Sequence, residues 1–454
     1  MLIQPVGRKE FEQRTFPREY SVIIYWENNH YYAKDRKGNL ICVDSPTACL
    51  QEAVDYVNNE KLGWIDNEGV GLIGVLTDIA ISKQVVITPL NRIWIRFHGK
   101  VWIGWINPPS SDPYGAIMIG DGSRTTWVDR PIIIEGGVFA SDPSKPNLYP
   151  FQINRIHGVV IREVHAATAN LVDVVGEATQ TLIDHCQIAN PPGMAIQFRT
   201  GPYSHGPGDS HVSRVLIQGG DYIQPTSGGI AIYNNTIWIT ETWIETIPNQ
   251  IVIENPQGID YPQVIVENSV LATSESQLVN DLITIKSGIN VYPHIIRNNS
   301  FAIFNPTTYA ININAQGIDP IIEGNVVSLF NGAGFIKANV ANDIYTVSRN
   351  KVRIFSQQKS NILNITGSLS DLILEGNHFY NYYYRRLEAN GGIYSGPGST
   401  TINIPHGLGT TPSRYIVIPI NTPQPTSTSV DNNIITINYS TAPQWVYIRW
   451  YAEV

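Results

Sequence analysis

Residues 296–301 read IRNNSF, and residues 322–327, 347–352 and 374–379 read IEGNVV, VSRNKV and LEGNHF. Each phrase has an aliphatic residue, two polar or small residues, an asparagine, and an apolar residue two places later. Weaker copies occur upstream, which gives ten copies between Ile133 and Tyr380. The turn position, which we call the anchor, holds Gly137, Val164, Cys186, Gly220, Thr242, Asn268, Asn299, Asn325, Asn350 and Asn377.

The columns that flank the anchor are apolar. The position three places before it is aliphatic in all ten copies, and the position two places after it is mostly aliphatic or aromatic. A repeat of this length with short β-branched runs cannot bury its apolar side alone, so copies must stack and share one interior. The sequence therefore predicts a solenoid of β-strands.

The asparagines have a physical reason to recur at a turn. Asparagine and glycine tolerate the left-handed backbone that a sharp turn between strands requires. Stacked asparagine amides can also hydrogen-bond from coil to coil. We therefore expect a structural ladder of Asn268, Asn299, Asn325, Asn350 and Asn377.

This run of asparagine anchors resembles the asparagine ladder of right-handed parallel β-helices, the fold of pectate lyases and phage tailspikes. The resemblance implies an all-β chain with a right-handed, single-stranded parallel β-helix of about 10–13 coils. A β-propeller or β-sandwich is the alternative. The gaps between anchors vary from 22 to 34 residues, which suits coils with variable loops better than blades of fixed size.

Composition limits the class of protein. The 454 residues are 43% hydrophobic and 15% charged, so the chain can bury a large core. The net charge of -8 and the lack of a Lys/Arg run argue against a nucleic-acid partner. No apolar stretch approaches the ~18 residues of a membrane span. The opening MLIQPVGRKEFEQR lacks the apolar core of a signal peptide, so we expect export within an assembled particle or retention in the cell.

Residues 1–60 are predicted to hold an arm, a β-meander and a capping helix. Ser45 and Pro46 supply a helix N-cap and first position, and Leu50, Ala53, Val54 and Val57 share one helical face. The order YYAK followed by SPTACLQEAVDYV resembles the N-terminal segment of pectate-lyase-like β-helix proteins of archaea and their viruses, although the Gly-Gly run usual after that helix is absent. Cys42 and Cys49 either form a small disulfide loop or stay free, and Cys186 is expected to be a buried thiol.

Residues 61–390 are predicted to form the β-helix and residues 391–454 a small β-sandwich domain. Glycines between Gly391 and Gly398 mark an expected linker. The stretches PHGLGTTPSRYIVIPI and WVYIRWYAEV resemble the C-terminal β-domains that close many phage and archaeal-virus tail fibres and tailspikes. That resemblance carries most of the functional expectation.

Candidate chemistry lies before the regular asparagine coils. Alternation places Asp221, Trp243 and Glu245 outward, and coil spacing predicts a separation of about 8 Å between the two carboxylates. That separation suits the ~6.5–9.5 Å of an inverting glycosidase, in which one carboxyl protonates the leaving oxygen and the other activates water. The alternative is that the two carboxylates only keep the surface soluble. An outward indole such as Trp243 favours a sugar contact.

The widest gap between anchors inserts a Gly/Pro/His loop from Thr200 to His211. We expect His165, His205, Asp209 and His211 to contact a glycan together with Trp243, because irregular loops on solenoids commonly carry function. These side chains could also act as acid and base or bind a metal. No metal-ligand spacing is present, and no cofactor is expected. The calcium aspartates and catalytic arginine of pectate lyases have no matching motif.

The sequence thus predicts a viral tailspike or attachment-fibre subunit, located in the virion tail, that binds host surface glycan with or without polysaccharide-degrading activity. The resemblance implies a homotrimer that contacts other virion tail proteins through its N-terminal region. The alternatives are a free polysaccharide hydrolase or lyase and a purely structural surface or filament protein.

Overall fold

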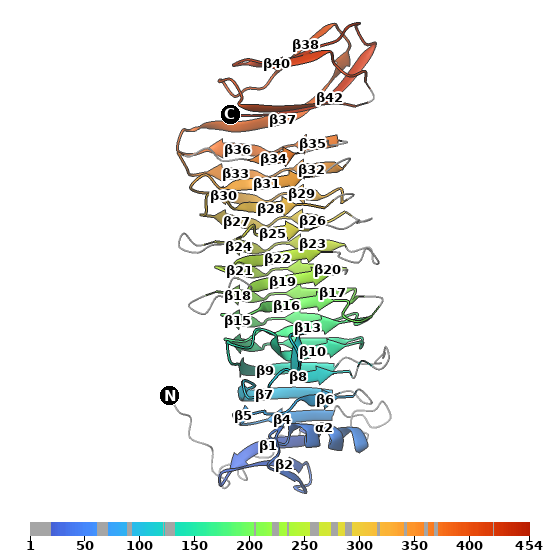
Figure 1. Cartoon of the computed structure of the whole chain (residues 1–454), viewed down its shortest axis with the longest axis vertical. Coiled ribbons are helices and arrows are strands. Elements are labelled where there is room, and N and C mark those ends of the chain that lie inside the picture. The colour runs from blue at the N-terminus through green and yellow to red at the C-terminus, as the bar shows by residue number, and fades with distance from the viewer. Residues whose placement is uncertain are drawn as a thin grey trace. The chain divides into compact units, whose positions relative to one another are not determined.

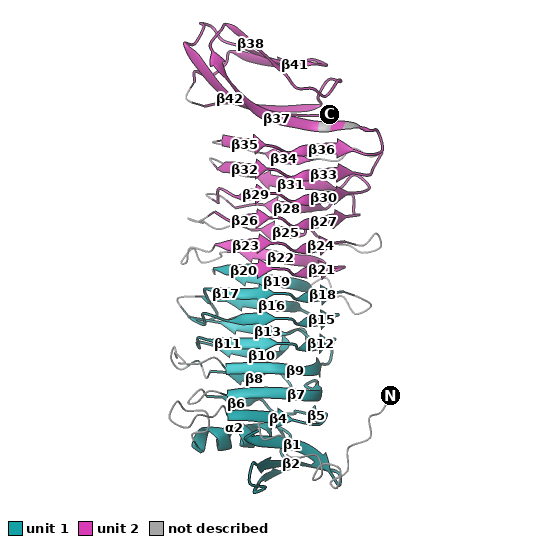
Figure 2. Cartoon of the chain, turned by 180° about the vertical axis from the view of Figure 1, so that it is seen from behind, with its two compact units in different colours: residues 1–238 teal, residues 239–454 magenta. Residues whose placement is uncertain are grey.

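The computed structural model describes residues 20–60, 71–88, 93–120, 122, 132–203, 206–219, 227–233, 236–254, 263–273, 280–286, 293–315, 318–339, 343–357, 362–366, 371–420 and 422–454. The chain divides into two compact units, residues 1–238 and 239–454 (Figure 2). Each unit contains a stack of parallel coils built from short strands (Figure 1). The predicted parallel β-helix is confirmed.

Unit 1 begins with an antiparallel meander of β1 (Val22–Glu27), β2 (His30–Asp35) and β3 (Leu40–Val43). Strand β1 also pairs in parallel with β4 (Gly71–Val75), which joins the meander to the first coil. The helix α2 (Leu50–Asn59) packs against β1, β3 and β6 (Val85–Ile87). Its buried residues are the four predicted from the sequence, Leu50, Ala53, Val54 and Val57.

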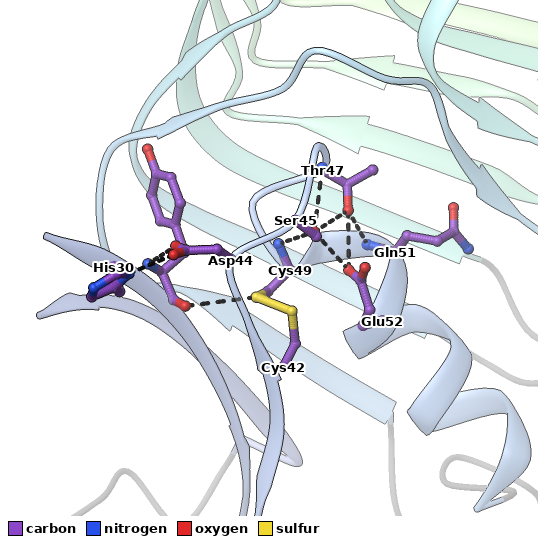
Figure 3. Close-up of a disulfide and its surroundings, with 9 residues drawn as sticks. His30, Cys42, Asp44, Ser45, Thr47, Cys49, Gln51 and Glu52 are labelled. Atoms are coloured by element: carbon purple, nitrogen blue, oxygen red, sulfur yellow. Dashed lines mark hydrogen bonds and ion pairs between the residues drawn. A yellow bond between two sulfur atoms is a disulfide. The ribbon is translucent and has the colours of Figure 1, made fainter.

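The helix begins later than predicted, at Leu50 instead of Pro46. Residues 46–49 form turns in which Ala48 and Cys49 have positive φ, so the backbone is not yet helical. The Ser45 hydroxyl accepts the N–H of Cys49 at 2.9 Å, and the Thr47 hydroxyl accepts the N–H of Gln51 at 3.3 Å (Figure 3). Cys42 and Cys49 are joined by a disulfide that fixes this turn to β3 (Figure 3).

A coil has a leading strand before the anchor, a middle strand after it, and a closing strand. In unit 1 the leading strands are β4, β7 (Ile93–Trp102), β9 (Ile132–Ala140), β11 (Val159–Arg162), β14 (Leu182–Asp184) and β17 (Ser210–Ser213). Strands β7 and β9 continue into the middle position, which is otherwise filled by β5 (Ile79–Ala80), β12 (His165–Ala167), β15 (Gln187–Ala189) and β18 (Leu216–Gln218). The closing strands are β6, β8 (Tyr114–Ile119), β10 (Leu148–Asn154), β13 (Val172–Val175), β16 (Met194–Arg199) and β19 (Gly228–Tyr233). The unit boundary falls within β20 (Ile237–Thr240).

Unit 2 repeats the arrangement. Its middle strands are β21 (Trp243–Glu245), β24 (Val270–Ala272), β27 (Ser300–Ile303), β30 (Val326–Leu329), β33 (Lys351–Ile354) and β36 (His378–Asn381). Its closing strands are β22 (Asn249–Glu254), β25 (Ile283–Ile285), β28 (Tyr309–Ile313), β31 (Gly334–Asn339) and β34 (Leu363–Thr366). Its leading strands are β23 (Val264–Glu267), β26 (Ile295–Arg297), β29 (Ile321–Glu323), β32 (Ile344–Ser348) and β35 (Asp371–Glu375).

The interior of each unit is formed by the alternate residues of these strands. In unit 1, Ile161 and Ile183 are fully buried and face each other across paired coils. In unit 2, Phe301 and Val327 do the same. Burial of a side chain of this size contributes about 1.5–3 kcal/mol, so each coil is stable only with its neighbours.

A ladder of side chains connects successive anchors in unit 2. The amide oxygens of Asn299, Asn325, Asn350 and Asn377 each accept a backbone N–H from the anchor of the preceding coil, at 2.9–3.0 Å. The Nδ2 groups of the same four residues donate to the backbone oxygens of Val266, Ile296, Ile322 and Val347. The ladder continues to Thr242, whose N–H donates to the hydroxyl of Ser269 at 3.1 Å.

Two predicted anchors are wrong. The strand pairing aligns Cys186 with Val215 instead of Gly220, because Gln187 pairs with Leu216. It also places Ser269 in the ladder instead of Asn268, because Trp243 pairs with Val270.

The left-handed residue is the one before the anchor, as at Asn268, Asn298 and Arg349. In these coils the anchor itself does not need a left-handed backbone. It needs a small buried side chain that accepts a hydrogen bond, and asparagine, serine and threonine all supply one.

After β36 the chain turns back into antiparallel strands. Strand β37 (Arg386–Pro397) pairs with β36 and then with β42 (Trp445–Glu453), which also pairs with β39 (Arg414–Pro419), so these strands extend the sheet of the coils. A separate three-stranded sheet is formed by β38 (Thr401–Pro405), β41 (Ile434–Asn438) and β40 (Ser427–Val430). One hydrophobic cluster that includes Ile404, Ile437 and Ile448 lies between these two groups of strands. Of the glycines predicted as a linker, Gly391, Gly392 and Gly396 lie within β37 instead, and Gly398 follows it. A side chain at Gly391 would meet the Leu374 side chain at 2.5 Å, so glycine permits the strand to cross that coil.

Side chains of the C-terminal strands satisfy the backbone of β34, the last closing strand described. The Glu453 carboxylate accepts the N–H of Ile362 at 2.9 Å, and the Arg414 guanidinium donates to the backbone oxygens of Leu363 and Ile365. An exposed strand edge would otherwise present these groups unpaired. Burial raises the pKa of Glu453.

The ladder predicts a specific loss of stability. Asn325→Ala leaves the buried N–H of Asn299 without its acceptor and the buried backbone oxygen of Ile296 without its side-chain donor. We therefore expect the free energy of unfolding to fall by about 1–3 kcal/mol. Asn268→Gly is the matched control, because Asn268 lies outside the ladder and has φ 53°, which glycine adopts at little cost. Thermal melting of both variants is the measurement, and equal melting temperatures would contradict the ladder assignment.

Candidate functional site

Strand β21 presents an exposed tryptophan on a fixed support. Ile244 points into the core, so Trp243 and Glu245 point outward, and the Trp243 side chain is 48% exposed. The indole Nε1–H donates to Glu245 Oε2 at 2.9 Å. This bond holds the ring in one orientation, which lowers the entropy that a ligand would have to overcome in stacking on it.

The coils that follow Trp243 carry short side chains beside it. Val270 pairs with Trp243 and Ala272 with Glu245, and Ser300 and Ala302 occupy the same positions on the next coil. We call the outward face of β21, β24 and β27 the shelf. Its small residues leave the indole standing above its neighbours, as a stacking surface for a sugar ring requires.

The catalytic pair predicted from the sequence loses its geometric basis. Asp221 was aligned with Trp243 through an anchor at Gly220, and that anchor is Val215. Asp221 lies outside the described residues, so no separation from Glu245 follows. Glu245 is half-buried and accepts the Trp243 indole N–H. This structural role explains the carboxylate at this position without a role in proton transfer.

The predicted histidines do not share one face. His165 opens the middle strand β12 and is half-buried, and burial lowers its pKa. His211 is exposed on the leading strand β17, where it stacks on Trp238 with ring centroids 4.7 Å apart and planes 9° apart. Asp209 is exposed with φ 47°, and His205 lies outside the described residues.

Trp238 was not predicted, although the sequence holds its signal. Ile237 and Ile239 alternate inward on β20, so the residue between them must point outward. The flat stack of Trp238 on His211 covers one face of each ring. The two rings form an outward aromatic pair on the neighbouring leading strands β17 and β20.

The start of the inserted loop lies at a different part of the coil from His165, which is on a middle strand. Tyr203 packs under Arg155 at 4.8 Å from the ring centroid, and its hydroxyl donates to Asn154 Oδ1 at 3.1 Å. Asn154 ends a closing strand, so the start of this loop lies at the corner between closing and leading strands. The sequence could not give this position, because it depends on side chains in earlier coils.

Other acidic residues of the coils are held by arginines. Arg214 binds Asp184 through two hydrogen bonds of 2.9 and 2.6 Å, and Arg199 binds the fully buried Asp173 through two of 2.8 Å. These hydrogen bonds, together with the nearby charges, lower the pKa of Asp184 despite its burial. We assign such pairs to the stability of the coils.

Among the described residues, no group of three His, Cys, Asp or Glu side chains could hold a metal ion. No helix in the described ranges is long and apolar enough to cross a membrane. The thiol of Cys186 is buried, which raises its pKa to about 12.

No family model and no curated protein matches this sequence. Solved structures match it by shape. Two mutant forms of the tailspike protein of E. coli bacteriophage HK620, each in complex with a pentasaccharide, align with TM-scores of 0.51 and 0.52 at 11% and 10% identity. Each alignment covers 92% of this chain and 92% of the tailspike chain. The chain shares its fold with phage tailspike proteins.

A second kind of protein has a similar fold. DFA-IIIase from Arthrobacter chlorophenolicus A6, in complex with GF2, aligns with a TM-score of 0.52 at 14% identity, over 73% of this chain and 91% of the enzyme. The tailspike alignments cover more of this chain, 92% against 73% for the enzyme. At these identities the likeness concerns the fold, and the functional argument must come from the residues of this chain.

Proposed function

We propose that this chain is a viral tailspike or attachment-fibre subunit that binds a host surface glycan through the shelf, with Trp243 as the stacking platform. The exposed, oriented indole carries the proposal. An exposed tryptophan side chain on a rigid strand is costly to hydrate, and stacking on a sugar ring would recover on the order of 1–3 kcal/mol. Solved tailspike structures of the same fold are in complex with a pentasaccharide, which supports the ligand class.

The disulfide supports a location outside a reducing cytosol. Disulfides are rare in cytosolic proteins and persist in oxidising surroundings or on virion surfaces. Cys42 and Cys49 are bonded within the N-terminal region. A place in the virion tail, with residues 1–60 as the mount toward other tail proteins, accounts for this bond.

Homotrimer formation is part of the proposal. In unit 2 the rings of Phe304, Phe330, Phe355 and Tyr382 stack in sequence, with centroids 4.3, 5.1 and 5.0 Å apart. These rings cover one another's faces, so their exposed edges suit contact with a protein surface better than with a sugar. A second copy of the chain is the simplest partner. Sedimentation at micromolar concentration should show a trimer, and a monomer alone would contradict this assignment.

The test of the proposed function begins with a glycan array probed with the purified full chain. For any glycan that binds, Trp243→Ala should weaken binding by roughly 5- to 150-fold, because it removes ~1–3 kcal/mol of stacking. Trp445→Ala is the matched control, since Trp445 is 59% exposed on the C-terminal strand β42. Melting temperatures should stay close to that of the unmodified chain for both variants.

Three further outcomes bear on the assignment. If Trp243→Ala binds the glycan as well as the unmodified chain and Trp445→Ala loses glycan binding, the site lies on the C-terminal strands instead. A release of reducing sugar ends from the bound glycan that survives Glu245→Gln would exclude Glu245 from any cleavage. No binding by any preparation would favour the purely structural alternative.

A further inference from the structure

The closing sheet of unit 2 carries a polar cleft that the sequence did not indicate. Its volume is about 380 Å³, within the range of about 300–1,000 Å³ for small-molecule sites. It opens on the outward face of β22, β25 and β28, which follow one another in the closing sheet (Figure 1). The lining includes Asn249, Asn280, Asp281, Thr284, Thr308 and Asn312.

The strand register explains why polar side chains gather here. Val252 pairs with Thr284, and Thr284 with Asn312, so these three side chains form one outward column across successive coils. Inward neighbours such as Ile283 and Ile311 are fully buried. The column therefore rests on a rigid core, and the cleft keeps its shape without a ligand.

One buried polar atom in this cleft has no partner. Asn312 is only 8% exposed, and its Oδ1 atom accepts no hydrogen bond in the described structure. The orientation of the amide is fixed, because Asn312 Nδ2 donates to Asp281 Oδ2 at 2.5 Å and only the nitrogen can donate to a carboxylate. The oxygen is thereby left free to accept a hydrogen bond from a ligand.

Asp281 places further acceptors next to the Asn312 amide group. Its Oδ1 accepts the Tyr309 N–H at 2.7 Å, and each carboxylate oxygen can accept more than one hydrogen bond. Burial raises the pKa of this carboxyl. Asp281 and Asn312 therefore offer oxygen acceptors held by backbone and amide donors, which suits the hydroxyl groups of a sugar.

The charge around the cleft points to an uncharged ligand. The Nζ atom of Lys286, at the rim, lies 3.5 Å from Oε2 of Glu254 on the preceding coil, so the charge of Lys286 is balanced. Most of the remaining lining consists of asparagine and threonine side chains. Lys337, which pairs with Asn312 on the next coil, balances the charge of Asp281, so an acidic sugar would find no unpaired cation in the cleft.

We propose that this cleft binds a neutral sugar unit, with Asn312 Oδ1 and Asp281 accepting its hydroxyl or acetamido hydrogens. The ligand class rests on the proposed function, but the site is separate from the shelf and depends on different residues. A bound water can satisfy Asn312 in the free protein, and a sugar hydroxyl that replaces it keeps the hydrogen bond.

The experiment uses the full chain and three defined probes, maltose, N,N'-diacetylchitobiose and digalacturonate, with affinity measured by saturation-transfer NMR titration. At least one neutral disaccharide should bind, and digalacturonate should bind more weakly. Asn312→Ala should weaken binding of the neutral probe roughly 5- to 30-fold, because a buried hydrogen-bonding group is lost. Asn339→Ala, an exposed asparagine on β31, is the control and should bind as the unmodified chain does.

A second variant guards against a folding defect. Thr284→Tyr fills the cleft from an outward strand position that does not reach the core, so it should abolish disaccharide binding and leave the melting temperature unchanged. Binding of neutral probes that is unaffected by Asn312→Ala and Thr284→Tyr would overturn the site. Failure of both neutral probes to bind, or a preference for digalacturonate, would overturn it as well.

The two proposals fail differently. If Trp243→Ala alone removes disaccharide binding, the cleft assignment is wrong and the shelf stands. If Asn312→Ala alone removes it and no glycan on the array depends on Trp243, the cleft stands and the shelf is wrong.

Discussion

The hydrogen bond from each anchor N–H to the side chain of the next anchor sets the register of unit 2. At the anchor the backbone turns between two strands, and the N–H of each coil is met by the acceptor of the coil that follows, as Asn299 is by Asn325. An acceptor displaced by one residue would leave a buried donor unpaired at a cost of about 1–3 kcal/mol. Once anchors align, the alternation of each strand fixes which residues face the core and which face outward.

The outward residues are therefore held on a rigid scaffold. The indole of Trp243 is oriented by Glu245, and the small residues of β24 and β27 beside it follow from the same register. On another face of the same unit, the register brings Thr284 and Asn312 into one polar column. A solenoid of this kind presents flat, preformed surfaces on several sides, which suits a protein that must hold an extended ligand without changing shape.

The repeat pattern was sufficient to predict the parallel coils and the outward position of Trp243, and helical periodicity predicted the buried face of α2. The repeat pattern failed where several residue types can fill the same position. Ser269 serves the ladder as well as an asparagine does, so the adjacent Asn268 was chosen wrongly. The spacing between Cys186 and Thr242 admitted two registers, and the wrong one placed Asp221 beside Glu245. The cleft could not be predicted, because Asp281 and Asn312 meet only through the stacking of two coils.

Hydrogen exchange at the anchor amides tests the ladder directly. The N–H groups of Ser269, Asn299, Asn325 and Asn350 are bonded to side chains and not to strand carbonyls, so a turn without the ladder would exchange quickly. The ladder predicts that these four amides exchange as slowly as those of the neighbouring middle strands, because opening one requires separation of two coils. Exchange at the rate of an exposed turn such as that at Asn331 would contradict the account.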